Sequence, residues 1–159
     1  DFTSKIIINS YEIMQTENYK DGKTILGVFS TYSRYAGERE AVFTAICRKN
    51  YGCSHFIVGR DHTGVGDKSL NNKGDIFDSF KDLGIKIIKF NSVYYSKSLK
   101  KYIEEIDDKN LDEDDKMAIS GTEAREMFQK GKVPPRWYMR KKISKMIVDS
   151  IKSKKEVFL

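Results

Sequence analysis

Short runs of β-branched and other apolar residues alternate along this chain with segments whose apolar residues recur at helical spacing. Four runs predict strands, at residues 24–29, 54–58, 85–90 and 116–119. Helical segments are predicted around them, over residues 5–14, 37–49, 74–81, 96–105, 120–129 and 140–153. Strands that alternate with helices favour an α/β fold built on a parallel sheet.

The best-defined local signal is Ser120, followed three residues later by Glu123, ahead of an apolar helical segment. Ser-x-x-Glu predicts a capping box, in which each of the two side chains accepts a hydrogen bond from the backbone N–H of the other residue. Gly131 is expected to be the residue just beyond the end of this helix, because glycine readily adopts the left-handed conformation found there. Pro134 and Pro135 then prevent the helix from continuing.

The charge balance favours anionic partners. The 29 Lys and Arg residues outnumber the 23 Asp and Glu residues, for a net charge of +6, which suits nucleotides, sulfate, nucleic acid or acidic membrane surfaces. Much of the excess lies in residues 140–155, where a solvated helix face is the commoner interpretation. Because a nucleic-acid site would need aromatic residues interleaved with these cations, we expect no nucleic-acid partner.

Three features bear on metals and location. The acidic stretch 107–115 lacks the glycine of a calcium loop and predicts a solvated loop. Cys47 and Cys53 form no CxxC or Cys/His ligand pattern, which fits free thiols in the reducing cytoplasm. The sequence has no run of about 18 apolar residues, so it predicts no membrane-spanning helix. The first residues lack the pattern of a signal peptide, as if the chain were joined part-way.

The loop GRDHTGVG (59–66) follows the predicted strand 54–58. Ligands of open α/β sheets bind outside the carboxyl ends of the strands, and glycines let backbone N–H groups approach an anion closely. Arg60 adds a forked cation suited to phosphate or sulfate, and His62 a donor or stacking ring. The alternative is a polar turn in which Asp61 pairs with Arg60.

A second candidate anion site lies at the predicted helix start Ser120-Gly121-Thr122, with Arg125 one turn further on. The first N–H groups of a helix and its dipole attract anions, and the Thr122 hydroxyl can add a contact. An ordinary capped helix with an exposed arginine is the alternative. Both motifs follow predicted strands, so we expect them to hold one ligand together.

Three blocks of sequence carry a resemblance to a known family. The segments RYAGEREA (34–41), AICRKNYGCSHFIVGRDHTGVG (45–66) and AISGTEAREMFQKGKVPPRWYMR (118–140) resemble ATP sulfurylases in order and spacing. The resemblance covers about residues 25–152. It implies a Rossmann-like nucleotidyltransferase fold with a parallel sheet, here partial and lacking its N-terminal half. On this basis residues 1–135 form the second half of the catalytic domain, and residues 136–159 a C-terminal helical segment.

The resemblance also implies an activity and a set of site residues. ATP sulfurylases convert ATP and sulfate to adenosine 5′-phosphosulfate and pyrophosphate, with sulfate attacking the α-phosphorus directly and Mg²⁺ on the nucleotide. Thr63, where the family usually has alanine, would contact sulfate through its backbone N–H. The residues implied to bind ATP are Gly59, Arg60, Asp61, His62, Val93 (through its main chain, at adenine), Ser120, Gly121 and Thr122.

Two departures from the family pattern limit the expected activity. The family's Gln-Thr-Arg-Asn-Pro segment with its paired histidines is absent, so this piece is expected to be inactive unless another chain supplies it. The stretch 96–115 lacks the Cys and His residues of a zinc knuckle, so no zinc is expected. The alternative function is a nucleotide- or anion-binding piece without turnover. The full enzyme is expected to form a homo-oligomer, and the presence of a following kinase domain stays open.

Overall fold

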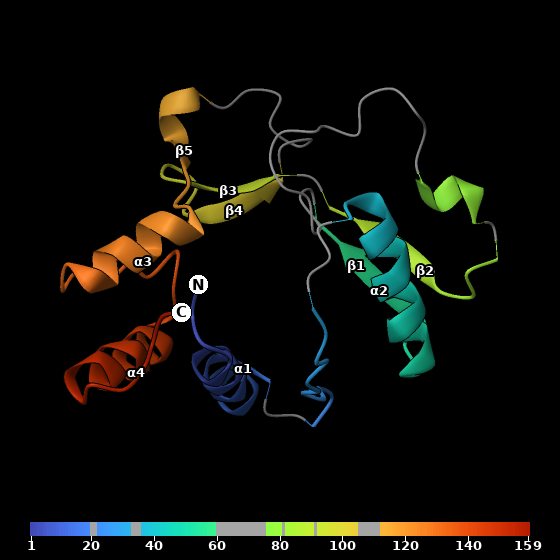
Figure 1. Ribbon diagram of the computed structural model, residues 1–159. Helices are drawn as coiled ribbons and strands as arrows, with labels where there is room; N and C mark the ends of the chain where they lie inside the picture. Colours follow the sequence, from blue (N-terminus) through green and yellow to red (C-terminus); the bar gives the residue numbers. More distant parts are fainter. Residues whose placement is uncertain (20–21, 33–35, 60–75, 81, 91, 105–111) are drawn as a thin grey trace. The chain divides into compact units, whose positions relative to one another are not determined.

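The computed structural model describes residues 1–19, 22–32, 36–59, 76–80, 82–90, 92–104 and 112–159 (Figure 1). They form an α/β structure of two compact units. The terminal unit comprises Asp1–Ser30 and Met117–Leu159, and the central unit comprises Thr31–Lys116. The predicted division into residues 1–135 and a C-terminal helical segment 136–159 stays a prediction.

The central unit contains the parallel strand pair that the sequence predicts. Strands β1 (His55–Val58) and β2 (Lys86–Lys89) pair in parallel, with Phe56 opposite Ile87 and Val58 opposite Lys89. Helix α2 (Glu38–Asn50) packs against β1 and buries Ala41, Val42 and Ala45. Of the helix predicted over 74–81, the described part is the 3-10 helix η1 (Ile76–Ser79).

A three-stranded sheet replaces the helix predicted over 96–105, so that prediction was wrong. Its strand order is β4-β3-β5, from β3 (Val93–Ser96), β4 (Lys101–Glu104) and β5 (Lys116–Met117). Strands β3 and β4 form an antiparallel hairpin, and the rings of Tyr95 and Tyr102 meet edge to face at 5.4 Å between centroids. Such cross-strand aromatic pairs stabilise a hairpin and here outweigh the helical propensity of the lysine-rich turn.

The terminal unit is helical and joins the two ends of the chain. Helices α1 (Ser4–Asn18), α3 (Gly121–Gln129) and α4 (Lys141–Lys152) make up this unit. Phe2 bridges Phe158, and the N–H of Thr3 donates to the carbonyl of Val157 at 3.0 Å, so the two ends lie side by side (Figure 1). The buried core of the unit consists of Ile6, Phe128, Ile143, Ile147 and Val157.

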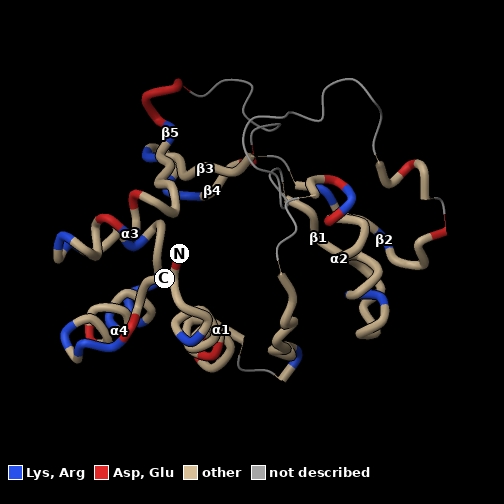
Figure 2. Tube along the Cα trace, in the orientation of Figure 1, with Lys and Arg blue, Asp and Glu red and all other residues tan. Residues whose placement is uncertain are grey.

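The basic C-terminal segment is a solvated helix face in this unit. Helix α4 buries Ile143 and Ile147, while its lysines lie exposed along the opposite face (Figure 2). Lys142 pairs with Glu17 of α1 at 2.5 Å. Within the described part of the chain, no helix is both long and apolar enough to cross a membrane.

The strand predicted over residues 24–29 is absent, and this prediction was also wrong. Residues 23–32 take no regular structure, and the side chain of Ile25 is 96% exposed. An isolated β-branched run gains stability only by pairing with a neighbour, and Gly27 weakens the run at its centre. Local propensity alone is therefore insufficient for a strand here.

Candidate functional site

The residues that follow β1 and β2 leave the sheet at one edge. Val58 and Lys89 are the last residues of the two strands and lie opposite each other. The N–H of Phe90 donates to the carbonyl of Val58 at 3.0 Å, so the chain after β2 starts beside the chain after β1. The segment that starts at Gly59 and the segment that leads from Phe90 to Val93 therefore both begin at the carboxyl edge of the parallel strand pair. Ligands of α/β proteins usually bind at this edge.

The predicted anion-binding loop begins at this edge. Gly59 is exposed, and a Cβ built on it would meet no atom within 4 Å. Arg60, Asp61, His62 and Thr63 lie outside the described residues, so their proposed contacts to ATP and sulfate stay predictions. What the structure supports is the position of the loop, directly after a strand of the parallel pair.

Val93 is the first residue of β3 and is 51% exposed. It lies three residues after Phe90, so a short connection joins it to the carboxyl edge of β2. Its main chain pairs opposite Glu104 in the hairpin. A main-chain contact from Val93 to adenine is compatible with this position and stays a prediction.

The capping box at the start of α3 is confirmed. Ser120 Oγ accepts from the N–H of Glu123 at 3.1 Å, and Glu123 Oε2 accepts from the N–H of Ser120 at 2.7 Å. The hydrogen bond from the Ser120 backbone is the main cause that lowers the pKa of the Glu123 carboxyl. Because the box uses the N–H of Glu123, the outer N–H groups of Gly121 and Thr122 remain available to an anion.

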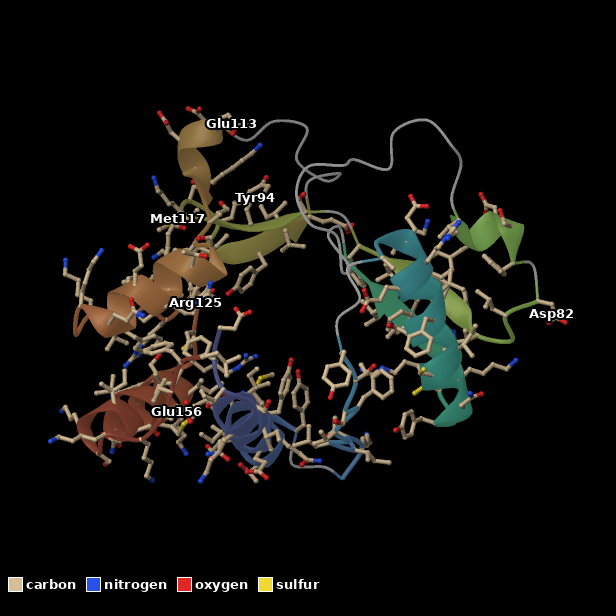
Figure 3. All side chains as sticks on the ribbon, in the orientation of Figure 1. Asp82, Tyr94, Glu113, Met117, Arg125 and Glu156 are labelled. Carbon is tan, nitrogen blue, oxygen red and sulfur yellow. The ribbon has the colours of Figure 1, made fainter. Side chains whose placement is uncertain are left out.

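Arg125 reaches back to this helix start (Figure 3). Its Nη2 donates to Thr122 Oγ1 and its Nη1 donates to Asp1 Oδ1, each at 3.0 Å. The sequence therefore correctly placed the guanidinium on the side of Ser120 and Thr122. The pair with Asp1 is largely exposed at the carboxylate, 78%, so it contributes little stability.

The two candidate clusters belong to different units. Gly59 and Val93 lie in the central unit, and Ser120–Thr122 lie in the terminal unit. Their joint contact with one ligand stays a prediction. Among the described residues, no group of three or more His, Cys, Asp or Glu side chains is arranged to hold a metal ion.

Sequence reasoning missed one polar cluster of the central unit. The predicted solvated loop 107–115 ends in the 3-10 helix η3 (Glu113–Asp115), and Asp115 accepts hydrogen bonds from Ser96 and Ser98. Figure 3 labels Glu113, the first residue of η3, and Tyr94 on strand β3. No local signal links partners 17 and 19 residues apart, so only the fold brings them together.

Replacing Ser120 by alanine should lower the free energy of unfolding by about 0.5–2 kcal/mol, the usual effect of losing a helix N-cap. Chemical denaturation followed by circular dichroism measures the change. Ser153→Ala is the matched control, because Ser153 is an exposed serine at the opposite end of a helix, α4. Equal stability of the two variants would show that the capping box does not hold α3.

Comparison with known proteins identifies the family. Residues 1–150 match the family model described as ATP-sulfurylase. The sulfate adenylyltransferase of Halothermothrix orenii is 38% identical over 156 residues, which cover 95% of this chain and 40% of that protein. That of Staphylothermus marinus is 39% identical over 149 residues, covering 93% and 39%. The chain belongs to the ATP-sulfurylase family.

The chain spans only part of these relatives. It covers 40% or less of the length of the proteins from Halothermothrix orenii and Staphylothermus marinus. A relative from Sorangium cellulosum, named as a probable bifunctional SAT/APS kinase, is 35% identical over 156 residues, which are 96% of this chain and 27% of that protein.

Proposed function

We propose that this chain is the nucleotide-binding part of a sulfate adenylyltransferase, which makes adenosine 5′-phosphosulfate and pyrophosphate from ATP and sulfate. The observation that carries the proposal is the match of residues 1–150 to the family, with the Gly59 loop starting at the carboxyl edge of a parallel strand pair. We further propose that the enzyme is cytoplasmic and forms a homo-oligomer.

Different candidate residues would bind different parts of ATP and sulfate. Arg60 and His62, with the backbone after Gly59, would hold phosphate oxygens, and the N–H of Thr63 would contact sulfate. Val93 would hold adenine through its main chain. A sulfate oxygen attacks the α-phosphorus, and the bond from this phosphorus to the bridging oxygen of pyrophosphate breaks. No protein nucleophile is needed, because positioning and charge neutralisation supply most of the rate enhancement.

The helix start would add a second anion cradle. The N–H groups of Gly121 and Thr122 and the guanidinium of Arg125 present positive charge at one end of α3. Mg²⁺ would come with the nucleotide and neutralise phosphate charge. We expect oxygens of the nucleotide itself to hold the ion.

A larger Rossmann-like sheet is part of this proposal. Parallel sheets are normally covered on both faces. In β1, alternate residues Phe56 and Val58 are more buried, whereas Ile57 between them is 60% exposed although α2 packs against the strand. We infer that a further part of the enzyme covers the Ile57 side and adds strands. That part would also bring the Gln-Thr-Arg-Asn-Pro segment and its histidines.

The decisive test is an assay of pyrophosphate release from ATP. The polypeptide encoded by the complete reading frame should release pyrophosphate only when sulfate is present and should form adenosine 5′-phosphosulfate. Residues 1–159 alone should bind ATP without turnover. Release that is independent of sulfate, or transfer of the adenylyl group to another acceptor, would refute the proposed reaction.

The alternative is a nucleotide- or anion-binding protein without turnover. The capped start of α3 with Arg125 beside it would serve this function equally well, because binding an anion requires no turnover. The same assay separates the two functions, because the alternative requires ATP binding by the complete polypeptide with no sulfate-dependent pyrophosphate.

A further inference from the structure

The carboxylate of Asp115 lies at the centre of a hydrogen-bond cluster in the central unit. Ser96 Oγ donates to Asp115 Oδ2, and Ser98 donates through its N–H to Oδ1 at 2.7 Å and through its hydroxyl to Oδ2 at 3.1 Å. Ser96 is fully buried, and its Oγ also accepts from the N–H of Leu99 at 3.0 Å. One carboxylate therefore holds the last residue of β3 and the turn that follows it.

This cluster compensates for a very short strand. Strand β5, which follows Asp115 directly, has only two residues, Lys116 and Met117. Beside the pairing of β3 with β5, the N–H of Lys97 donates to the Asp115 carbonyl at 3.1 Å, and the side-chain Nζ of Lys97 donates to the Asp114 carbonyl at 2.7 Å. A slip of one residue would shift β5 by about 3.3 Å and turn its side chains to the opposite face of the sheet.

The Asp115 carboxyl is ionised, which strengthens the hydrogen bonds that hold the chain next to β5. The hydrogen bond from Ser96 is the main cause that lowers the pKa of the carboxyl; burial opposes it, and the bonds from Ser98 and the charge of Lys97 add to it. The carboxylate therefore stays charged at neutral pH. Hydrogen bonds to an ionised acceptor are roughly twice as strong as those between neutral groups.

We propose that Asp115 is a positioning residue of the ATP site, acting by fixing the register of β5 against β3. The inference rests on the proposed function and adds a residue to it. Strand β3 begins with Val93, the expected adenine contact, and Ser120, where the α3 anion cradle begins, follows β5 by three residues. The Asp115 cluster thus holds the last residue of β3, the strand that begins with Val93.

The first experiment measures steady-state kinetics on the polypeptide from the complete reading frame. Asp115→Ala and Ser96→Ala should raise the KM for ATP about tenfold, with kcat changed less than about threefold, because misplaced binding groups weaken ground state and transition state alike. Asp115→Asn, which keeps one acceptor oxygen, should fall between Asp115→Ala and the wild type. The KM for sulfate should change less than about twofold.

Asp114→Asn is the matched control, since it removes the same charge from the neighbouring residue. The Asp114 carboxylate accepts none of the side-chain hydrogen bonds found in the described part of the chain, so this variant should behave as wild type. A lower Tm or a smaller active fraction in Asp115→Ala, with the KM for ATP unchanged, would show a purely structural role and overturn the proposal.

A second measurement keeps this inference separate from the proposed function. Absence of sulfate-dependent pyrophosphate in the wild type would refute the function itself. The register is then tested by amide hydrogen exchange in residues 1–159, where Asp115→Ala should speed exchange at Lys97, Ser98 and Leu99 at least about tenfold relative to Asp114→Asn. Unchanged exchange at these three amides would overturn the role given to Asp115.

Discussion

Replacing Phe128 by alanine should lower the free energy of unfolding by about 3–5 kcal/mol, the range for removing a fully buried aromatic side chain. Phe128 is 2% exposed and belongs to the core cluster of the terminal unit together with Ile6, Ile143 and Ile147. Its ring meets the ring of Phe2 edge to face, with centroids 6.3 Å apart. The substitution removes contacts to α1, α4 and the N-terminal segment at once and leaves a cavity among them.

Urea denaturation followed by circular dichroism measures this effect. Val133→Ala is the control in the same unit, because Val133 is 50% exposed and its truncation should change stability by no more than about 0.5 kcal/mol. If Phe128→Ala lowers the free energy of unfolding by less than about 1 kcal/mol, either the neighbouring side chains fill the cavity or Phe128 does not link α1, α3 and α4.

Replacing Arg60 by alanine should lower kcat/KM for ATP about 10- to 150-fold in the complete enzyme. A charge-assisted hydrogen bond to phosphate contributes about 1.5–3 kcal/mol, and each 1.4 kcal/mol is a factor of ten. The prediction depends on the resemblance and on the place of the loop, which starts at Gly59 directly after β1. Sulfate-dependent release of pyrophosphate is the measurement.

Two further variants make the Arg60 result interpretable. Arg60→Lys keeps the charge but loses the forked donors, so its activity should fall between those of the wild type and Arg60→Ala. Arg136→Ala removes an exposed arginine of the terminal unit and should leave activity unchanged. Activity of Arg60→Ala within twofold of wild type would show that Arg60 serves the polar turn and does not contact phosphate.

Features determined by neighbouring residues were predictable from the sequence. The capping box of Ser120 and Glu123 needs only the local chain, and it forms as expected. Gly131 takes φ 71° and ends α3 through the bond from its N–H to Phe128 and the bond from the N–H of Lys132 to Met127. One pairing between distant segments was also predictable, because the alternation of apolar strands with helices favours parallel neighbours such as β1 and β2.

Other features determined by distant partners were not predictable. Residues 101–104 form a strand because Tyr102 and Ile103 pair with β3, whereas the run at 24–29 has the composition of a strand and no strand pairing in the described part of the chain. Asp115 looked like one more charge in an acidic loop, because its serine partners lie far away in sequence. In the candidate site, the exit of the chain at Gly59 was predicted correctly for a local reason, because an apolar strand-forming run ends at Val58.

The pairing of Phe2 with Phe158 has a consequence for how this piece can be built into a longer polypeptide. The N–H of Leu159 donates to the carbonyl of Asp1 at 2.7 Å, so polypeptide entering at residue 1 and leaving at residue 159 would pass through the same spot on the surface. Such a piece could be inserted into, or excised from, a host protein as a closed loop. A linker of a few residues would suffice to circularise it.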